Sequence, residues 1–427
     1  MTNILLKHVR SFWNPQPISI KPLTLVVGEN STGKTTFLSM LAHIYGFEFP
    51  SFRPSFNNPP FDLGPFGAIA TFKGGRGGRA DSFGIGLSEM SPSGEARDLL
   101  ATYVNHKGQP QLQEVHGSDG SGEISVQFEA DSDSAMLAFQ LKGSERRQIQ
   151  LNLEKFLPGS LAIRPMVRIS VLEWLEKEQG QRPFQLSTIL NHVDMLRGLG
   201  KRVFAFSPVR TRPRRTYDET NSDFDPEGNH VFVLLARLWQ ERDSAESVRI
   251  FTELRKFGES STLFKKVDVK LLGKDPSDPF QIRVATAGHF ANLIDVGYGV
   301  SQALPLIVQS LRAGGKALLL LQEPEIHLHP RAQAALGTFF SHLVATQGTS
   351  VVIETHSDYL IDRVRSEIAR GTISATDVRI LFFEKKQVNT TIHELSVDKE
   401  GNISGAPSTY RKFFLEEEIS LLRRTAR

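Results

Sequence analysis

The chain has 427 residues, 40% of them hydrophobic, and a formal charge of +3, so it can hold two or three structural units and its near-neutral charge does not by itself indicate a nucleic-acid partner. Cysteine is absent, which excludes disulfides and cysteine-based zinc sites. The apolar runs are too short for a membrane-spanning helix, and residues 1–10 lack a secretion signal, so we expect a cytoplasmic protein with no membrane partner.

The first clear pattern is a short apolar strand at residues 23–27 followed by a helix over 36–42. Between them the sequence satisfies G-x-x-x-x-G-K-[ST], in which the backbone folds around phosphates at a helix N-terminus. In this motif Lys34 reaches the β- and γ-phosphates, and the Thr35 hydroxyl ligates Mg²⁺. The sequence therefore predicts an ATP and Mg²⁺ site formed by Gly28, Asn30, Ser31, Thr32, Gly33, Lys34, Thr35 and Thr36.

Two further segments follow this motif. Short alternating runs at 82–87, 123–128 and 148–153, separated by Gly, Ser and Asp clusters, indicate antiparallel strands. Residues 1–154 are thus predicted to hold the phosphate-binding motif and an antiparallel β lobe. From 155 to 264 the apolar spacing is mainly helical, as at 186–196 and 231–239, with one strand at 202–206. We interpret 155–264 as a helical insertion or arm.

Residues 265–427 alternate between strands and helices. The pattern predicts strands at 316–321, 350–354 and 378–383, with helices at 331–344 and 358–369 between them. Such alternation indicates a parallel sheet with crossover helices, whose strand ends are where phosphate chemistry converges. The predicted fold class is α/β, a P-loop nucleotide-binding fold with a mostly parallel core sheet.

Polar residues end two of these strands. After 316–321 the usual pair is an Asp on the Mg²⁺ side and a Glu that polarises the attacking water. Here the pair is Gln322 and Glu323. The general base is present, but the amide adds no charge for Mg²⁺, so we expect slow hydrolysis. Glu325 is a nearby carboxylate for which a site role and a plain loop position are both open.

The strand at 350–354 is followed by a polar corner that contains His356. A histidine there can donate a hydrogen bond to the terminal phosphate or to the attacking water. We therefore expect His356 to act as the sensor of the γ-phosphate. His327 and His329 also lie near the acidic pair, but without further ligands their spacing favours a loop or interface role over a metal site.

A second candidate anion site lies at 295–302, where glycines precede Ser301, Gln302 and an apolar helix. One nucleotide does not need two such sites on the same face. We therefore expect Ser301 and Gln302 to bind the γ-phosphate held by another protomer, in preference to a simple helix cap.

Basic residues cluster in two places. Arg202, Arg210, Arg212, Arg214 and Arg215 lie within fourteen residues, and Lys73, Arg76 and Arg79 lie in a glycine-rich loop. Either cluster could meet DNA phosphates, other phosphates or the acidic face of a protein partner, and a solvated loop is an equally open interpretation.

The four motifs, in this order, resemble the ABC-type ATPase heads of SMC and RecF-like proteins. The segments 323–330 and 354–357 are most similar to bacterial AAA-type ATPases, a group that includes OLD-family nucleases and the ATPase subunits of anti-phage systems such as Septu, PARIS and retron-associated modules. The resemblance implies that residues 28–36 are the Walker A motif, Ser301 and Gln302 the signature acting in trans, Gln322 and Glu323 the Walker B pair, and His356 the switch histidine. It also makes Arg210 a candidate for a contact at the nucleotide or dimer interface.

The resemblance further implies a homodimer or higher oligomer that closes head to tail around ATP and regulates a separate effector, a nuclease or toxin, in phage defence. About seventy residues follow His356 and contain no Asp-x-Asp motif, so a built-in nuclease is not expected. The alternative from a different class is a DNA-binding repair or maintenance ATPase of RecF or SMC type that acts directly on DNA.

Overall fold

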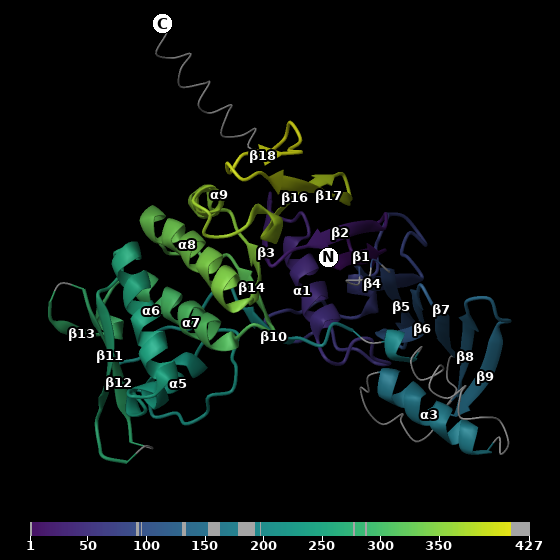
Figure 1. The fold of residues 1–427 in the computed structure, drawn as a ribbon, viewed down its shortest axis with the longest axis horizontal. Coiled ribbons are helices and arrows are strands. Elements are labelled where there is room, and N and C mark those ends of the chain that lie inside the picture. The colour runs from purple at the N-terminus through teal and green to yellow at the C-terminus, as the bar shows by residue number, and fades with distance from the viewer. Residues whose placement is uncertain are drawn as a thin grey trace, which may run out of the picture.

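The computed structural model describes residues 2–90, 94, 96–129, 134–152, 163–177, 193–196, 198–275, 278–286 and 288–410. Two lobes lie on either side of helix α1 (Lys34–Tyr45) (Figure 1). One lobe is built on a mostly parallel sheet with helices, and the other on an antiparallel sheet. None of the described helices is both long and apolar enough to cross a membrane.

The core sheet has seven strands in the order β10-β14-β15-β3-β16-β17-β18. The first five run parallel, and β17 and β18 continue the sheet in antiparallel pairing. The bounds are β10 Arg202–Phe206, β14 Ala317–Gln322, β15 Ser350–Glu354, β3 Leu23–Gly28, β16 Val378–Lys386, β17 Asn389–Val397 and β18 Ile403–Ser404. The sheet therefore joins the N-terminal strand β3 to strands from the second half of the chain, which places the polar ends of β14 and β15 beside the Gly28 end of β3.

Both faces of the core sheet are covered, which explains the continuous apolar runs of its strands. Leu319 and Leu321 belong to the core on one face, with α5 (His230–Gln240), α6 (Ala245–Ser261), α7 (Tyr298–Ala313), α8 (Pro330–Gln347) and α9 (Asp358–Ala369). Leu318 and Leu320 belong to the core on the other face, with α1 and the antiparallel sheet. A small sheet of β11 (Lys266–Leu271), β12 (Phe280–Ala285) and β13 (Phe290–Asn292) adds to the first core.

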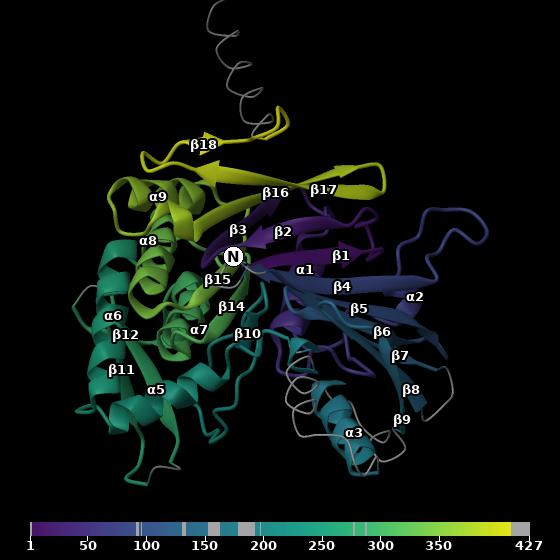
Figure 2. The same cartoon turned by 45° about the vertical axis from the view of Figure 1, so that its right-hand side comes forward.

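The antiparallel sheet has eight strands in the order β2-β1-β4-β5-β6-β7-β8-β9 (Figure 2). Its bounds are β2 Gln16–Ile20, β1 Thr2–Lys7, β4 Ser82–Met90, β5 Ala96–His106, β6 Gln109–Asp119, β7 Gly122–Phe128, β8 Ser134–Leu141 and β9 Arg147–Asn152. The short helix α2 (Phe66–Ile69) lies against β5 and β6, and α3 (Ile163–Lys177) against β9. The predicted α/β class, with a mostly parallel core and an antiparallel β lobe, is confirmed.

The segment 155–264 divides differently from the predicted helical arm. Strand β10 pairs in parallel with β14, with Phe206 opposite Leu321, and α5 and α6 pack on the core sheet. The core sheet therefore resumes at residue 202, inside that segment. The predicted helix at 186–196 lies outside the described residues except for 193–196.

Candidate active site

The loop between β3 and α1 has the backbone that the glycine motif requires. Gly28 and Gly33 have φ of 144° and 96°, a region that favours glycine. A Cβ on Gly28 would lie 2.4 Å from the Phe383 carbonyl oxygen, so no larger residue fits there. Lys34 Nζ donates to the carbonyls of Gly28 at 3.1 Å and Glu29 at 2.8 Å, which holds the loop curled around its own lysine.

The other predicted residues of this loop divide by exposure. Asn30, Ser31 and Thr35 are exposed, and Thr32 and Thr36 are buried. Thr32 Oγ1 donates to the Glu29 carbonyl at 2.8 Å. The exposed members are therefore available to a ligand, whereas Thr32 supports the shape of the loop.

A cavity of about 670 Å³ opens over this loop, a size in the range of small-molecule sites. Arg10, Arg79 and Lys385 bring positive charge to its lining. Arg10 is tied to the motif, because it donates to Thr36 Oγ1 at 3.1 Å and to the Leu63 carbonyl at 3.0 Å. Lys385 Nζ donates to the Ser31 carbonyl at 3.3 Å. Sequence reasoning missed Arg10 and Lys385 as site residues, because only the pairing of distant strands brings them here.

Glu354 at the end of β15 also lines this cavity and is 5% exposed. Thr35 Oγ1 lies 3.2 and 3.1 Å from its two carboxylate oxygens, and Lys34 Nζ lies 3.9 Å away. Burial raises the pKa of Glu354, while Lys34 and the Thr35 hydroxyl act in the opposite direction. Burial likewise lowers the pKa of Lys34. Sequence reasoning named this residue only as part of a motif and gave it no role.

Gln322, the predicted metal-side residue, points elsewhere. Its side chain is buried, and Nε2 donates to the Phe206 carbonyl on β10 at 3.3 Å. Strand β10 lies on the side of β14 away from β3. In this structure the Gln322 amide therefore ties two strands of the core sheet together and does not contact Lys34 or Thr35.

Glu323 and His356, the predicted base and sensor, lie close to each other. His356 Nε2 is 4.0 Å from a Glu323 carboxylate oxygen, and both side chains are partly exposed. Burial, followed by the nearby charge of Lys34, lowers the pKa of His356. The neutral ring that results can both donate and accept a hydrogen bond.

A buried network links the residues around this pair. Glu325 Oε1 accepts hydrogen bonds from Thr355 Oγ1 and from the His356 backbone N–H, both at 2.7 Å. Arg210, 1% exposed, donates to the Pro324 carbonyl at 3.4 Å, and burial lowers its pKa to about 10 while Glu325 opposes the shift. Glu325 thus has a positioning role for the His356 corner, and Arg210 is a buried support of the Glu323 loop.

Ser301 and Gln302 are placed differently from the expected surface contact. Each is 1% exposed. Ser301 Oγ donates to the Tyr298 carbonyl at 2.8 Å, and Gln302 Oε1 accepts from the Arg210 backbone N–H at 3.2 Å. In this conformation neither side chain lies at the surface of the protein. The exposed side chain at the start of α7 is Tyr298. Its ring lies 5.0 Å from the ring of His327, in the loop that contains Glu323.

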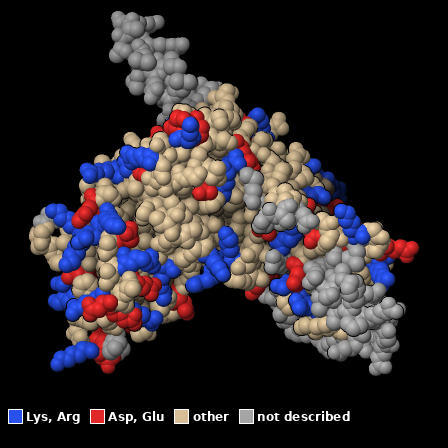
Figure 3. Space-filling model, in the orientation of Figure 1, with Lys and Arg blue, Asp and Glu red and all other residues tan. Residues whose placement is uncertain are grey.

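Three of the five arginines in the first cluster are buried or paired with an acid. Arg210 is buried, Arg214 pairs with Glu219 at 2.6 Å, and Arg215 pairs with Asp295 at 2.6 Å. On the face in Figure 3, blue and red atoms are interspersed over the lobe that carries α5 and α6. That lobe therefore shows no continuous basic surface on this face.

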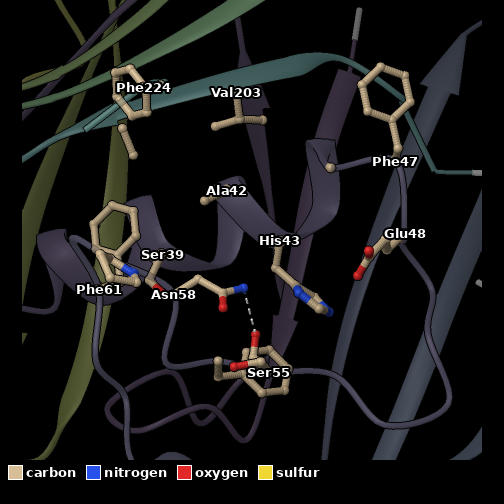
Figure 4. A pocket seen from close by; sticks show the side chains of 14 residues that line it. Ser39, Ala42, His43, Phe47, Glu48, Ser55, Asn58, Phe61, Val203 and Phe224 are labelled. Atoms are coloured by element: carbon tan, nitrogen blue, oxygen red, sulfur yellow. Dashed lines mark hydrogen bonds between the residues drawn. The ribbon is translucent and has the colours of Figure 1, made fainter. Parts of the chain in front are cut away.

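A second cavity, of about 440 Å³, lies near the C-terminal end of α1 (Figure 4). Phe47, Phe61 and Phe224 are among its lining, with His43. Burial lowers the pKa of His43 to about 4, so its ring is neutral at physiological pH. Without Lys or Arg among its lining residues, this cavity lacks the charge that a phosphate site requires.

Histidine-rich metal sites are also not found. Among the described residues, no group of three His, Asp or Glu side chains could hold a metal ion. His329 caps α8, where Nδ1 accepts a hydrogen bond from the Arg331 N–H at 3.4 Å. The Thr35 hydroxyl and the Glu354 carboxylate beside it are oxygen donors of the type that Mg²⁺ combines with nucleotide phosphates.

Residues 200–362 match the family model described as "AAA domain, putative AbiEii toxin, Type IV TA system". This part of the chain is similar to AAA-type ATPase domains. It holds β10, the start of α7, Gln322, Glu323 and His356, and the core sheet joins it to the glycine loop near the N-terminus. Among curated proteins, no sequence matches this chain.

Solved structures of SMC heads are similar in fold but distant in sequence. An SMC head bound to the C-winged helix domain of ScpA is 11% identical, with a TM-score of 0.46, covering 93% of this chain and 98% of that one. The SMC head domain from Thermotoga maritima is 11% identical, with a TM-score of 0.40, covering 92% and 98%. The Pyrococcus furiosus Smc head is 12% identical, with a TM-score of 0.40, covering 100% of both chains. These TM-scores are low, and we draw nothing from the likeness.

Proposed function

We propose that this protein binds and hydrolyses Mg²⁺-ATP, that ATP closes two copies head to tail, and that the closed form regulates a separate effector in phage defence. The observation that carries the proposal is the arrangement in the cavity of about 670 Å³, where Lys34, Thr35 and Glu354 line one wall. Glu323 and His356, 4.0 Å apart, lie at the neighbouring strand ends.

Each part of this arrangement suits one part of a nucleoside triphosphate. The loop amides and Lys34 would hold the phosphates, and Arg10, Arg79 and Lys385 would add positive charge around them. Bound Mg²⁺ would neutralise charge on the phosphates. Glu323 would accept a proton from the attacking water, and the neutral His356 ring would hydrogen-bond the same region.

The effector and the defence role rest on two similarities. The matched family is described as a putative toxin of a toxin–antitoxin system, and the segments 323–330 and 354–357 resemble the ATPase subunits of anti-phage systems. The alternative of direct DNA binding is less favoured at the first arginine cluster, where Arg210 is buried and Arg214 and Arg215 pair with acids.

The experiment is equilibrium binding of a fluorescent ATP analogue to the full chain and to Lys34→Ala. Removing the lysine takes away the charge that faces the phosphates, so we expect affinity to fall at least about tenfold, the factor that corresponds to about 1.4 kcal/mol. Lys256→Ala is the matched control, because Lys256 is exposed on α6 and pairs only with Glu253 in the described structure. Equal affinity of wild type and Lys34→Ala for the analogue would show that the nucleotide does not bind at this loop.

A further inference from the structure

Gln322 brings no carboxylate to the Mg²⁺ side of the site. A carboxylate from another position, that of Glu354, contacts Thr35 there. We infer that Glu354, from the neighbouring strand β15, takes the place of the acid that Gln322 lacks and supports Mg²⁺ together with Thr35. This inference rests on the proposed ATP function and deepens it by assigning the metal side of the same site.

The register of the core sheet allows Glu354 to take the role of an acid at position 322. Gln322 and Glu354 are paired neighbours at the ends of two parallel strands, β14 and β15. Strand β15 lies between β14 and β3. A side chain at the end of β15 is therefore one strand closer to the glycine loop than a side chain at the end of β14.

The contacts of Glu354 point to the metal side. Thr35 Oγ1 lies 3.2 and 3.1 Å from its two oxygens. A hydroxyl that donates to a carboxylate keeps its lone pairs available for a cation. Glu354 and Thr35 also line the same cavity. Mg²⁺ is bound in such sites by one or two carboxylates with phosphates and water, so this pair has the donor types that the ion requires.

The remaining carboxylates have other partners. Glu323 lies beside His356 at 4.0 Å. Glu325 is 7% exposed and accepts hydrogen bonds from Thr355 and the His356 N–H. Glu354 is thus the carboxylate that contacts Thr35 in the part of the chain that the structure describes, and Glu325 is a buried acid of matched size that does not.

The experiment measures the affinity of a fluorescent ATP analogue with Mg²⁺ and with EDTA, and the affinity of Mn²⁺ for the ATP complex by electron paramagnetic resonance. Wild type and the control Glu253→Gln, which changes an acid that pairs with Lys256 on α6, should bind the analogue more tightly with Mg²⁺ than with EDTA. In Glu354→Gln the Mn²⁺ affinity should fall about 10- to 100-fold. Its affinity in EDTA should be unchanged or higher, because a negative charge near the phosphates is gone.

The outcomes separate this role from a structural one. The inference is overturned if Glu354→Gln gains as much affinity for the analogue from Mg²⁺ as wild type does. It is also overturned if the variant loses the same affinity with Mg²⁺ and with EDTA, because that result indicates a damaged loop. The double variant Gln322→Asp, Glu354→Gln should recover part of the Mn²⁺ affinity. The Phe206 carbonyl repels a carboxylate at position 322 and turns it toward the glycine loop. A double variant with no higher Mn²⁺ affinity than Glu354→Gln contradicts the inference. Wild type that binds ATP in neither condition contradicts the proposed function instead.

Discussion

At the ends of β14 and β15, three carboxylates have three different partners. Glu354 contacts Thr35, Glu323 lies beside His356, and Glu325 accepts from Thr355 and the His356 N–H. The partners differ because neighbouring positions of these strand ends face different walls of the site. Carboxylates of one type can therefore serve a metal, a water molecule and a loop within a few residues of each other.

The buried side chain of His43 makes the stability of the protein depend on pH. Its Nε2 is shielded and has no hydrogen-bond partner among the described residues, and burial lowers its pKa from 6.5 to about 4. Between these pH values the unfolded chain binds a proton that the folded state excludes, so stability falls as the pH decreases. The loss is about 1.4 kcal/mol per pH unit, on the order of 3 kcal/mol across the window.

We expect His43→Phe to flatten this acid loss, because the ring lies 4.5 Å from Phe56 and 5.6 Å from Phe49 and a phenyl group can occupy its place. Urea unfolding at several pH values between about 6.5 and 4, the two pKa values, gives the free energy of unfolding for both proteins. Parallel pH profiles for wild type and variant would show that His43 is not the titrating group.

At the scale of elements, the strands and helices of the core were predictable because each has its own apolar pattern. The predicted strands at 202–206 and 350–354 and the helix at 358–369 have the bounds of β10, β15 and α9. The pairing of these strands in the sheet was harder to predict from the sequence. That β10 joins the core sheet depends on its contact with β14, more than a hundred residues later, and no local pattern records such a contact.

The same limit applies to the candidate site. The residues of the glycine loop, Glu323 and His356 were recognised because each lies in a local motif. Glu354 and Arg10 were not, because their nearness to Thr35 and Thr36 follows from strand order and a distant turn. The burial of Ser301 and Gln302 was equally hidden, since it depends on Tyr298 and on the chain around Arg210.

For the whole molecule, the central question is whether ATP joins two copies through the start of α7. Gly297 precedes this helix with φ of −56°, and a Cβ there would meet nothing within 4 Å. An Asp at this position suits the helix N-terminus. In a head-to-tail dimer, however, its charge would lie against the partner's γ-phosphate and repel it.

We therefore expect Gly297→Asp to keep or raise the thermal stability of the monomer and to abolish ATP-dependent dimers. Light scattering after size-exclusion chromatography, with ATP and in a Glu323→Gln background that slows hydrolysis, measures the dimer. Val248→Asp is the control, because Val248 is 54% exposed on α6, near the other end of α7 where Arg312 meets Glu246. An ATP-dependent dimer that survives Gly297→Asp would place the interface elsewhere.

The most direct test of the account is steady-state phosphate release from Mg²⁺-ATP by wild type and by Glu323→Gln. We expect measurable turnover by wild type and a fall of at least about 100-fold in the variant, since a positioned general base contributes on the order of 10²–10⁴ to the rate. ATP affinity should be retained in the variant. Equal turnover in the two proteins, or none in wild type, would contradict hydrolysis at this site.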